Sequence, residues 1–317
     1  MKRNLILLVC LFFISIVTVK AQTSKVALQH SGNVTLYNAD ELSKALDASV
    51  DGDTLYLNEG TFTGGITIKK KVTIIGSGSA SIISGDVTIA FTGTPTLTAN
   101  LLDALNISGT INITSAVNGL KLRKCKFTNI SFSAYINDMI IDRCFCTNTF
   151  TLSTYVKGLT VINSKIYNLN GGAYNTSAAT FINCCIYIIY ASSFSGTIMN
   201  SILYTYYNYS WYGGFGNSAL LVNTLVNTSN LTITGCTTQN CMESTNFSIN
   251  GSTCECNLTT DDLQNASYLG NDGTVVGVYG GTTPFTLVPA VPTVSSYKIN
   301  VDAANKKLNV NLKVTAN

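Results

Sequence analysis

Charged residues are scarce in this sequence. Only 11% of the 317 residues are Asp, Glu, Lys or Arg, against about 25% in an ordinary soluble domain. Three of the 19 basic residues lie within the first 21 positions, so the remaining chain has 16 basic and 16 acidic residues and is formally neutral. Nucleic-acid binding depends on a basic surface. We therefore expect no nucleic-acid partner.

Long apolar runs are missing beyond the N-terminus, because Asn, Ser, Thr and Gly interrupt every one of them. A transmembrane helix needs about 20 consecutive apolar residues. The first residues differ: Lys2 and Arg3 precede an uncharged apolar stretch, and Val19-Lys20-Ala21 offers a cleavage site. This layout predicts a signal peptide at residues 1–21. We expect an exported protein of the periplasm, cell surface or extracellular space, without a transmembrane anchor after cleavage.

Residues for acid–base chemistry are also few. His30 is the only histidine, and the 77 residues from 166 to 242 contain no Asp, Glu, Lys, Arg or His. General acid–base catalysis needs titratable groups, so this stretch offers none. The sequence also lacks a phosphate-binding loop, a dinucleotide motif and a nucleophile elbow.

What the sequence does have is an internal repeat. Six segments align: Leu120–Phe127, Met139–Cys146, Leu159–Ile166, Ala179–Ile186, Gly196–Leu203 and Ala219–Val226. Their fifth positions are Lys124, Arg143, Asn163, Asn183, Asn200 and Asn223, spaced 17 to 23 residues apart. Apolar residues alternate within each segment, as in a strand with one buried face. Asn tolerates the left-handed backbone region and bonds its own backbone, so the fifth position predicts a bend between two strands.

One such unit is too short to bury its apolar face, whereas stacked copies close a continuous core. The repeat therefore predicts an all-β fold, a parallel β-helix with about 20 residues per coil. Looser copies of the pattern lie between residues 72 and 113. We expect the solenoid to span residues 22–285.

The start of the chain resembles a known family. Four segments carry the resemblance: Asn38–Leu46, Asp51–Leu57, Gly60–Phe62 and Val72–Gly76. They look like the opening of right-handed parallel β-helix proteins of the pectate-lyase-like superfamily. The resemblance implies a short helix near residues 39–48 that caps the first coil, and Leu42, Ala45 and Leu46 would form its apolar stripe. Because that superfamily includes lyases, hydrolases, esterases, adhesins and inert spikes, it implies a fold rather than an activity.

The C-terminal residues 286–317 predict an extended connector and a β-hairpin. Alternating apolar residues favour strands at Ser296–Val301 and Lys307–Val314. This tail is similar to one that recurs in secreted β-helix proteins of the Bacteroidetes type. It could cap the last coil, or offer a strand to a neighbouring chain or a secretion partner.

One group of residues could support catalysis. Lyases that resemble this fold use Asp-bound calcium and an Arg or Lys base, whereas the Gly-His-Gly element of related polygalacturonases is absent. Three consecutive coils hold Arg123, Lys124, Asp138, Asp142, Arg143 and Lys165, which could bind a uronate and abstract a proton. An ordinary solvated face is the alternative. Calcium belongs only to the lyase hypothesis; otherwise we expect no cofactor and no metal site.

The uncharged run is rich in aromatic residues. The candidate ligand-binding residues are Tyr167, Tyr187, Tyr204, Tyr206, Tyr207, Tyr209, Trp211 and Tyr212. The first three share one column of the repeat, and Tyr and Trp suit sugar rings or protein partners. A ladder that stabilises the sheet, or that packs beneath a loop, is the alternative.

We expect the protein to be a non-catalytic, adhesin-like rod that binds a glycan or a surface protein. One alternative is a polysaccharide lyase or glycoside hydrolase, and another is a purely structural surface component.

Nine cysteines follow residue 21. Cys125, Cys144 and Cys184 share a repeat column with Ser and Thr, which predicts small buried side chains there. Cys236, Cys241, Cys254 and Cys256 are disulfide candidates, since an exported protein meets an oxidising compartment. Core thiols or a zinc site are the alternatives for these four.

Overall fold

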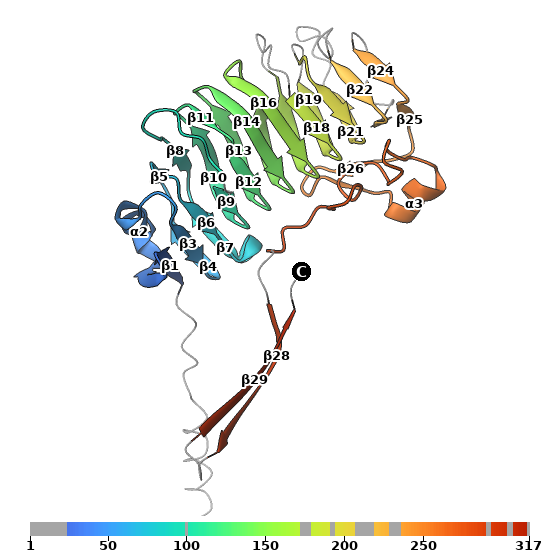
Figure 1. Ribbon diagram of the computed structural model, residues 1–317. Coiled ribbons are helices and arrows are strands. Elements are labelled where there is room, and N and C mark those ends of the chain that lie inside the picture. The colour runs from blue at the N-terminus through green and yellow to red at the C-terminus, as the bar shows by residue number, and fades with distance from the viewer. Residues whose placement is uncertain are drawn as a thin grey trace, which may run out of the picture.

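The computed structural model shows a parallel β-solenoid of about 8 turns with about 20 residues per turn (Figure 1). The structure describes residues 24–98, 101–171, 179–190, 194–206, 219–227, 236–289, 293–302 and 307–315. The predicted fold class is confirmed: the described chain is predominantly β, and its coils stack in parallel register.

Two long sheets form the walls of the solenoid. Sheet A contains β1 (Lys25–His30), β2 (Asn33–Asn38), β3 (Thr54–Leu57), β6 (Thr73–Ile75), β9 (Leu102–Asp103), β11 (Val117–Asn118), β12 (Lys121–Arg123), β14 (Ile136–Asp142), β16 (Val156–Ile162), β18 (Ala179–Ile182), β20 (Thr197–Met199), β22 (Leu220–Val222) and β24 (Thr237–Gln239). Sheet B contains β4 (Gly60–Thr63), β5 (Ile66–Ile68), β7 (Ser81–Ser84), β8 (Val87–Ile89), β10 (Asn106–Ile113), β13 (Lys126–Phe132), β15 (Phe145–Thr151), β17 (Lys165–Asn170), β19 (Cys185–Tyr190), β21 (Ile202–Tyr206), β23 (Leu225–Asn227) and β25 (Met242–Ser244). Strands from β3 onward pair in parallel from one coil to the next, whereas β1 and β2 are antiparallel at the start of sheet A.

From β9 onward, one residue per coil makes the turn from sheet A to sheet B with a positive φ, and Ala104 is the first of these residues. The six predicted bend positions, Lys124, Arg143, Asn163, Asn183, Asn200 and Asn223, have φ between 44° and 52°. The prediction of a left-handed bend is therefore confirmed. The described side chains differ from the prediction in one respect, because Asn163 and Asn200 bond a distant segment of the chain.

A ladder of small polar side chains follows each bend inside the solenoid. The Ser164 hydroxyl donates to the Ile162 carbonyl at 2.8 Å and accepts from the Cys144 amide at 3.0 Å. The Ser201 hydroxyl repeats both bonds two coils later. Cys, Ser and Thr fill this column because each can bond the carbonyl two residues back without taking much space.

The predicted helix closes the N-terminal end of the core. A short 3₁₀ turn, η1 (Ala39–Glu41), leads into α2 (Leu42–Ala48), and Asn38 and Glu41 form a capping box at its start. Leu42, Ala45 and Leu46 are buried in the same apolar core as the coils. These are the three residues that the sequence predicted for the apolar stripe.

A second layer follows the last coil and covers part of the outside of sheet B. It contains β26 (Ile249–Asn250), β27 (Glu255–Cys256) and α3 (Thr260–Asn265). Its apolar residues, among them Phe247, Leu263 and Val276, bury outward side chains of sheet B such as Ile202 and Leu225. The coils therefore end at β25, whereas the sequence suggested coils up to residue 285.

Residues 268–289, here called the return segment, run back along the bends toward the N-terminus (Figure 1). The Asn200 amide donates to Asn271 at 2.8 Å, and the Asn163 amide donates to the carbonyls of Val278 and Gly280 at 3.2 and 2.8 Å. Further along, the Lys124 amine donates to the Val288 carbonyl at 2.7 Å. The stacked bend residues, here called the file of bends, therefore form the surface on which the return segment lies.

The C-terminal strands β28 (Thr293–Asp302) and β29 (Lys307–Thr315) pair antiparallel with each other as a hairpin. Among the described residues, no helix is long and apolar enough to cross a membrane.

We expect Asn163→Ala to destabilise the fold more than Asn163→Gly. Both variants lose the hydrogen bonds to the return segment, at about 1–3 kcal/mol, but Ala adds roughly 1 kcal/mol for a left-handed backbone that Gly adopts freely. Urea unfolding of both variants measures the difference. Asn240→Gly, at the exposed bend of the last coil with φ of 49°, is the control and should unfold like the wild type. If Asn163→Gly were also unchanged, the contacts to Val278 and Gly280 would contribute nothing.

Candidate functional site: a basic cavity beside the bends

A cavity of about 420 Å³ lies between the bends of two coils and the return segment. Its solenoid wall carries Arg123, Lys124 and Arg143. The return segment supplies the opposite wall, which includes Thr282, Thr283, Pro284, Thr286 and Val288. Three cations and three threonines therefore line one space, together with a larger share of apolar surface. Cations and threonine hydroxyls in a partly apolar hollow suit an anionic ligand that also has hydroxyl groups.

Carboxylates hold both arginines in place. Arg123 on β12 donates from Nε and Nη2 to one oxygen of Asp103, which lies opposite on β9. Arg143 donates from Nε to both oxygens of its neighbour Asp142, at 3.0 Å each. Neither Nη1 has a hydrogen-bond partner among the described residues. Each guanidinium is thus oriented by the protein and keeps a donor for a ligand.

Lys124 is the buried cation of the cavity, with 5% of its surface exposed. Burial lowers its pKa, and the nearby charges of Arg143 and Arg123 lower the pKa further. A lysine with a lowered pKa has a larger fraction of neutral amine at a given pH, and the neutral amine is the form that accepts a proton. It is held in the cavity by its bond to the Val288 carbonyl.

The other members of the predicted cluster lie elsewhere. Asp138 is exposed near the start of β14, away from the bend that follows this strand. Lys165 is buried on the outside of sheet B, where it pairs with Glu255 from the second layer and lies over the Phe285 ring at 4.3 Å. The Tyr279 hydroxyl donates to the same carboxylate, and burial, with the charge of Glu255, raises the pKa of Tyr279 to about 12. Lys165 thus fastens the second layer and does not join the basic cavity.

The tyrosine column forms a ladder, but it lies against the second layer. Ring centroids are 5.3 Å apart between Tyr167 and Tyr187 and 5.6 Å between Tyr187 and Tyr204, and the second pair is stacked at 10°. All three rings are half-buried against the second-layer core, and Tyr204 also contacts Phe247. Tyr207, Tyr209, Trp211 and Tyr212 lie outside the described residues, as does the side chain of Tyr206. The second layer therefore covers part of the three candidate ligand-binding tyrosines of this column.

All nine described cysteines are free thiols, including Cys236, Cys241, Cys254 and Cys256. Burial raises the pKa of Cys254 to about 12, so its reactive thiolate form is rare at neutral pH. No group of His, Cys, Asp and Glu within the described chain is arranged to hold a metal ion. The acidic pair at 261 and 262 begins α3, where Asp262 and Thr259 bond each other in a capping box.

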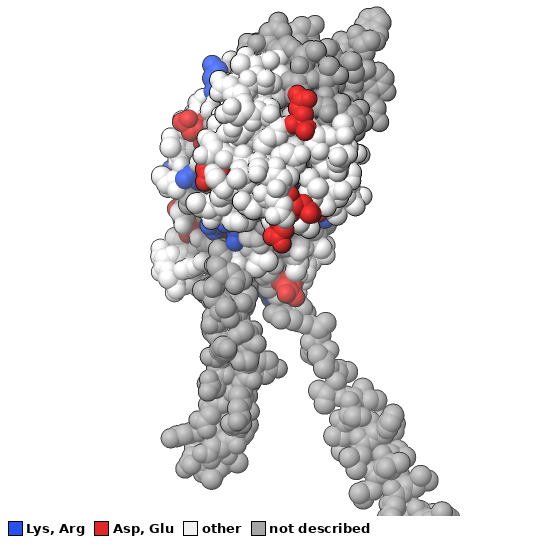
Figure 2. All heavy atoms as spheres, turned by 90° about the vertical axis from the view of Figure 1, so that its right-hand side faces the viewer, with Lys and Arg blue, Asp and Glu red and all other residues white. Residues whose placement is uncertain are grey.

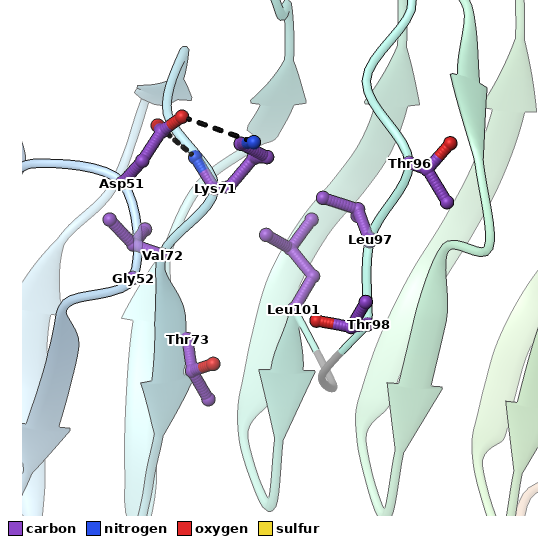
Figure 3. Close-up of a pocket in the computed structure, with 9 residues that line it drawn as sticks. All are labelled: Asp51, Gly52, Lys71, Val72, Thr73, Thr96, Leu97, Thr98 and Leu101. Atoms are coloured by element: carbon purple, nitrogen blue, oxygen red, sulfur yellow. Dashed lines mark hydrogen bonds and ion pairs between the residues drawn. The ribbon is translucent and has the colours of Figure 1, made fainter.

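A second cavity, of about 490 Å³, opens on sheet A between the coil of Lys71 and the coil of Leu101. Figure 3 shows Asp51 and Lys71 turned toward each other at one end, apart from Thr98 and Leu101. The Lys71 amine is 3.5 Å from the Asp51 carboxylate, and both side chains are about half exposed. This cavity has no net charge and no activated group, so it is the weaker candidate despite its size.

Sequence patterns did not reveal two features of this surface. The threonines of the cavity wall are more than 130 residues away in the chain from Arg143, so no local sequence pattern predicts that they lie beside it. Tyr135 and Tyr155, which are 55% and 40% exposed, lie at the turns before β14 and β16, outside the aligned repeat. Figure 2, seen from the side of β24 and α3, shows mostly uncharged surface with a few scattered charged groups.

Comparison of the chain with protein-family models, with curated proteins and with solved structures gives no match.

We expect Glu255→Gln to destabilise the protein more than Lys165→Met. The first variant leaves the Lys165 ammonium, only 4% exposed, without its counter-charge, and such a loss costs about 3 kcal/mol or more. The second leaves Glu255, which is 40% exposed, free to be hydrated. Thermal unfolding of the two variants compares them directly. Equal losses would mean that Lys165 reaches solvent and does not depend on Glu255.

Proposed function

We propose that the protein is a non-catalytic solenoid that binds acidic glycans in the basic cavity. One observation carries the proposal. In the file of left-handed bends from Ala104 to Asn240, the two bends with cationic side chains, Lys124 and Arg143, are the two that line the cavity. A residue other than Gly or Asn in this conformation costs roughly 1–2 kcal/mol, and such strain is retained where a side chain has a task.

The chemistry of the walls supports an acidic sugar in particular. Two arginines with a free donor each suit a carboxylate or sulfate group, and the hydroxyls of Thr282, Thr283 and Thr286 suit the sugar hydroxyls. A ligand of this class also fits an exported protein, which the signal-like residues 1–21 and the resemblance to the pectate-lyase-like superfamily favour. The same resemblance favours a right-handed coil and a surface or periplasmic site of action.

A second candidate function, a polysaccharide lyase, is favoured by Lys124. Its lowered pKa raises the fraction of neutral amine, which is the form that accepts a proton. The arginines beside it could neutralise the uronate carboxylate. Under this alternative, turnover would rise with pH through the pKa of Lys124, and unsaturated products would appear by ultraviolet absorbance. Turnover of polygalacturonate with calcium that disappears in Lys124→Met would replace the binding proposal by this one.

We expect Arg143→Ala to weaken binding of oligogalacturonate about tenfold, because a charge-assisted hydrogen bond of about 1.4 kcal/mol is lost. Isothermal titration calorimetry in low salt measures the effect, and added salt should weaken wild-type binding. A neutral oligosaccharide of the same length should bind much more weakly.

Lys44→Ala is the matched control, since it removes one positive charge from the exposed surface of α2, outside the cavity. It should leave binding unchanged. Loss of affinity in Lys44→Ala equal to that in Arg143→Ala would mean that only net charge matters. No binding of any acidic glycan by the wild type would remove the proposal.

A further inference from the structure

Two exposed tyrosines lie in adjacent coils where β14 and β16 begin, at the opposite end of these strands from the basic cavity. Tyr135 and Tyr155 precede β14 and β16, and the strand residues that follow them, Ile136 and Val156, are partners in parallel register. Their ring centroids are 5.4 Å apart with the planes at 89°. Neither phenol hydroxyl has a partner among the described residues, and neither ring belongs to either core.

The backbone fixes this pair. The Ile136 amide donates to the Tyr155 carbonyl at 2.9 Å, and the Val117 amide donates to the Tyr135 carbonyl at 3.1 Å. The Lys157 amine lies 5.5 Å from the centre of the Tyr135 ring. A rigid, exposed aromatic pair with free hydroxyls and a nearby cation matches what a sugar ring needs, namely an apolar face to stack on and polar groups at its rim.

A side chain suited to contact a sugar therefore lies at each end of β14, because Tyr135 precedes this strand and Arg143 follows it. The strand has 7 residues, which spans about 20 Å at about 3.3 Å per residue. The outer face between the ends is polar and carries charges of both signs, because the exposed Asp138 and the half-buried Asp142 lie on β14 among the basic residues of its neighbours. Asn137 lies beside Asn118 and Lys157, and Ile140 lies beside Lys121 and Thr160. In Figure 1, β14 and β16 lie side by side, and β11 and β12 lie in the preceding coil, where both pair with β14.

We infer that the outer face of sheet A along β14 is a track for an extended acidic glycan. One sugar ring stacks on Tyr135 and Tyr155, and an acidic group of the same glycan enters the basic cavity at Arg143. This inference rests on the proposed function and adds to it a second contact, a ligand direction along β14 and a minimum ligand length. A short acidic sugar reaches only the cavity, whereas a long one reaches both ends.

The test compares galacturonate oligomers of two lengths, the dimer and the octamer. Tyr135→Ala and Tyr155→Ala should weaken octamer binding about fivefold to tenfold, the usual worth of an aromatic contact, and should leave dimer binding unchanged. Arg143→Ala should weaken both. Tyr56→Ala is the control, because Tyr56 is an equally exposed tyrosine of sheet A, on β3.

The outcomes separate the two hypotheses. A wild type that binds dimer and octamer alike, with octamer binding unchanged in both Tyr variants, overturns the track and leaves the cavity proposal in place. Equal losses for dimer and octamer in Tyr135→Ala also overturn the track, since they mean general damage to the site. A wild type that binds neither oligomer overturns the cavity proposal and the track together.

Discussion

From β9 onward, each coil turns from sheet A to sheet B at one residue held in the left-handed backbone region, and the return segment and the basic cavity depend on this bend. The amide of each bend residue donates to a carbonyl of the next coil, as from Arg143 to Ile162 and from Asn163 to Ile182. Successive bends therefore lie directly above one another, and their side chains form a straight file on one corner of the solenoid. The return segment lies on this file, and the basic cavity forms where the file changes from Asn to Arg and Lys.

The position after the bend accounts for four of the nine described cysteines, namely Cys125, Cys144, Cys184 and Cys241. That position faces the core and needs a small side chain that can bond the carbonyl two residues back. Cys184 meets the need as Ser201 does, with Sγ 3.3 Å from the Ile182 carbonyl. Burial raises the pKa of Cys184 to about 12, so its thiol stays protonated and unreactive. Local packing thus accounts for these cysteines without any redox role.

The sequence predicted what short-range periodicity encodes. The repeat, the bends and the three buried residues of α2 follow from side chains that are neighbours in the chain or one coil apart. Lys165 was misplaced because Glu255, its partner, is 90 residues away, and only the second layer brings the two together. The same layer turned Tyr187 from an outward residue of a bare sheet into a half-buried one. Alternation predicts which face a side chain takes, but not what later covers that face.

Scarcity of charge makes the position of each remaining charge informative. A solenoid can fill its bends with Asn at little cost, as four of the six aligned bends do here. Lys124 has the less favourable residue type for a left-handed bend, and its amine is also buried beside two arginines. Both features oppose stability, although the amine also bonds the Val288 carbonyl of the return segment. Asp103 and Asp142 offset part of the repulsion among the three cations. The coincidence of both features at the described cavity lined by both arginines supports the proposal of an acidic ligand, which would supply further negative charge there.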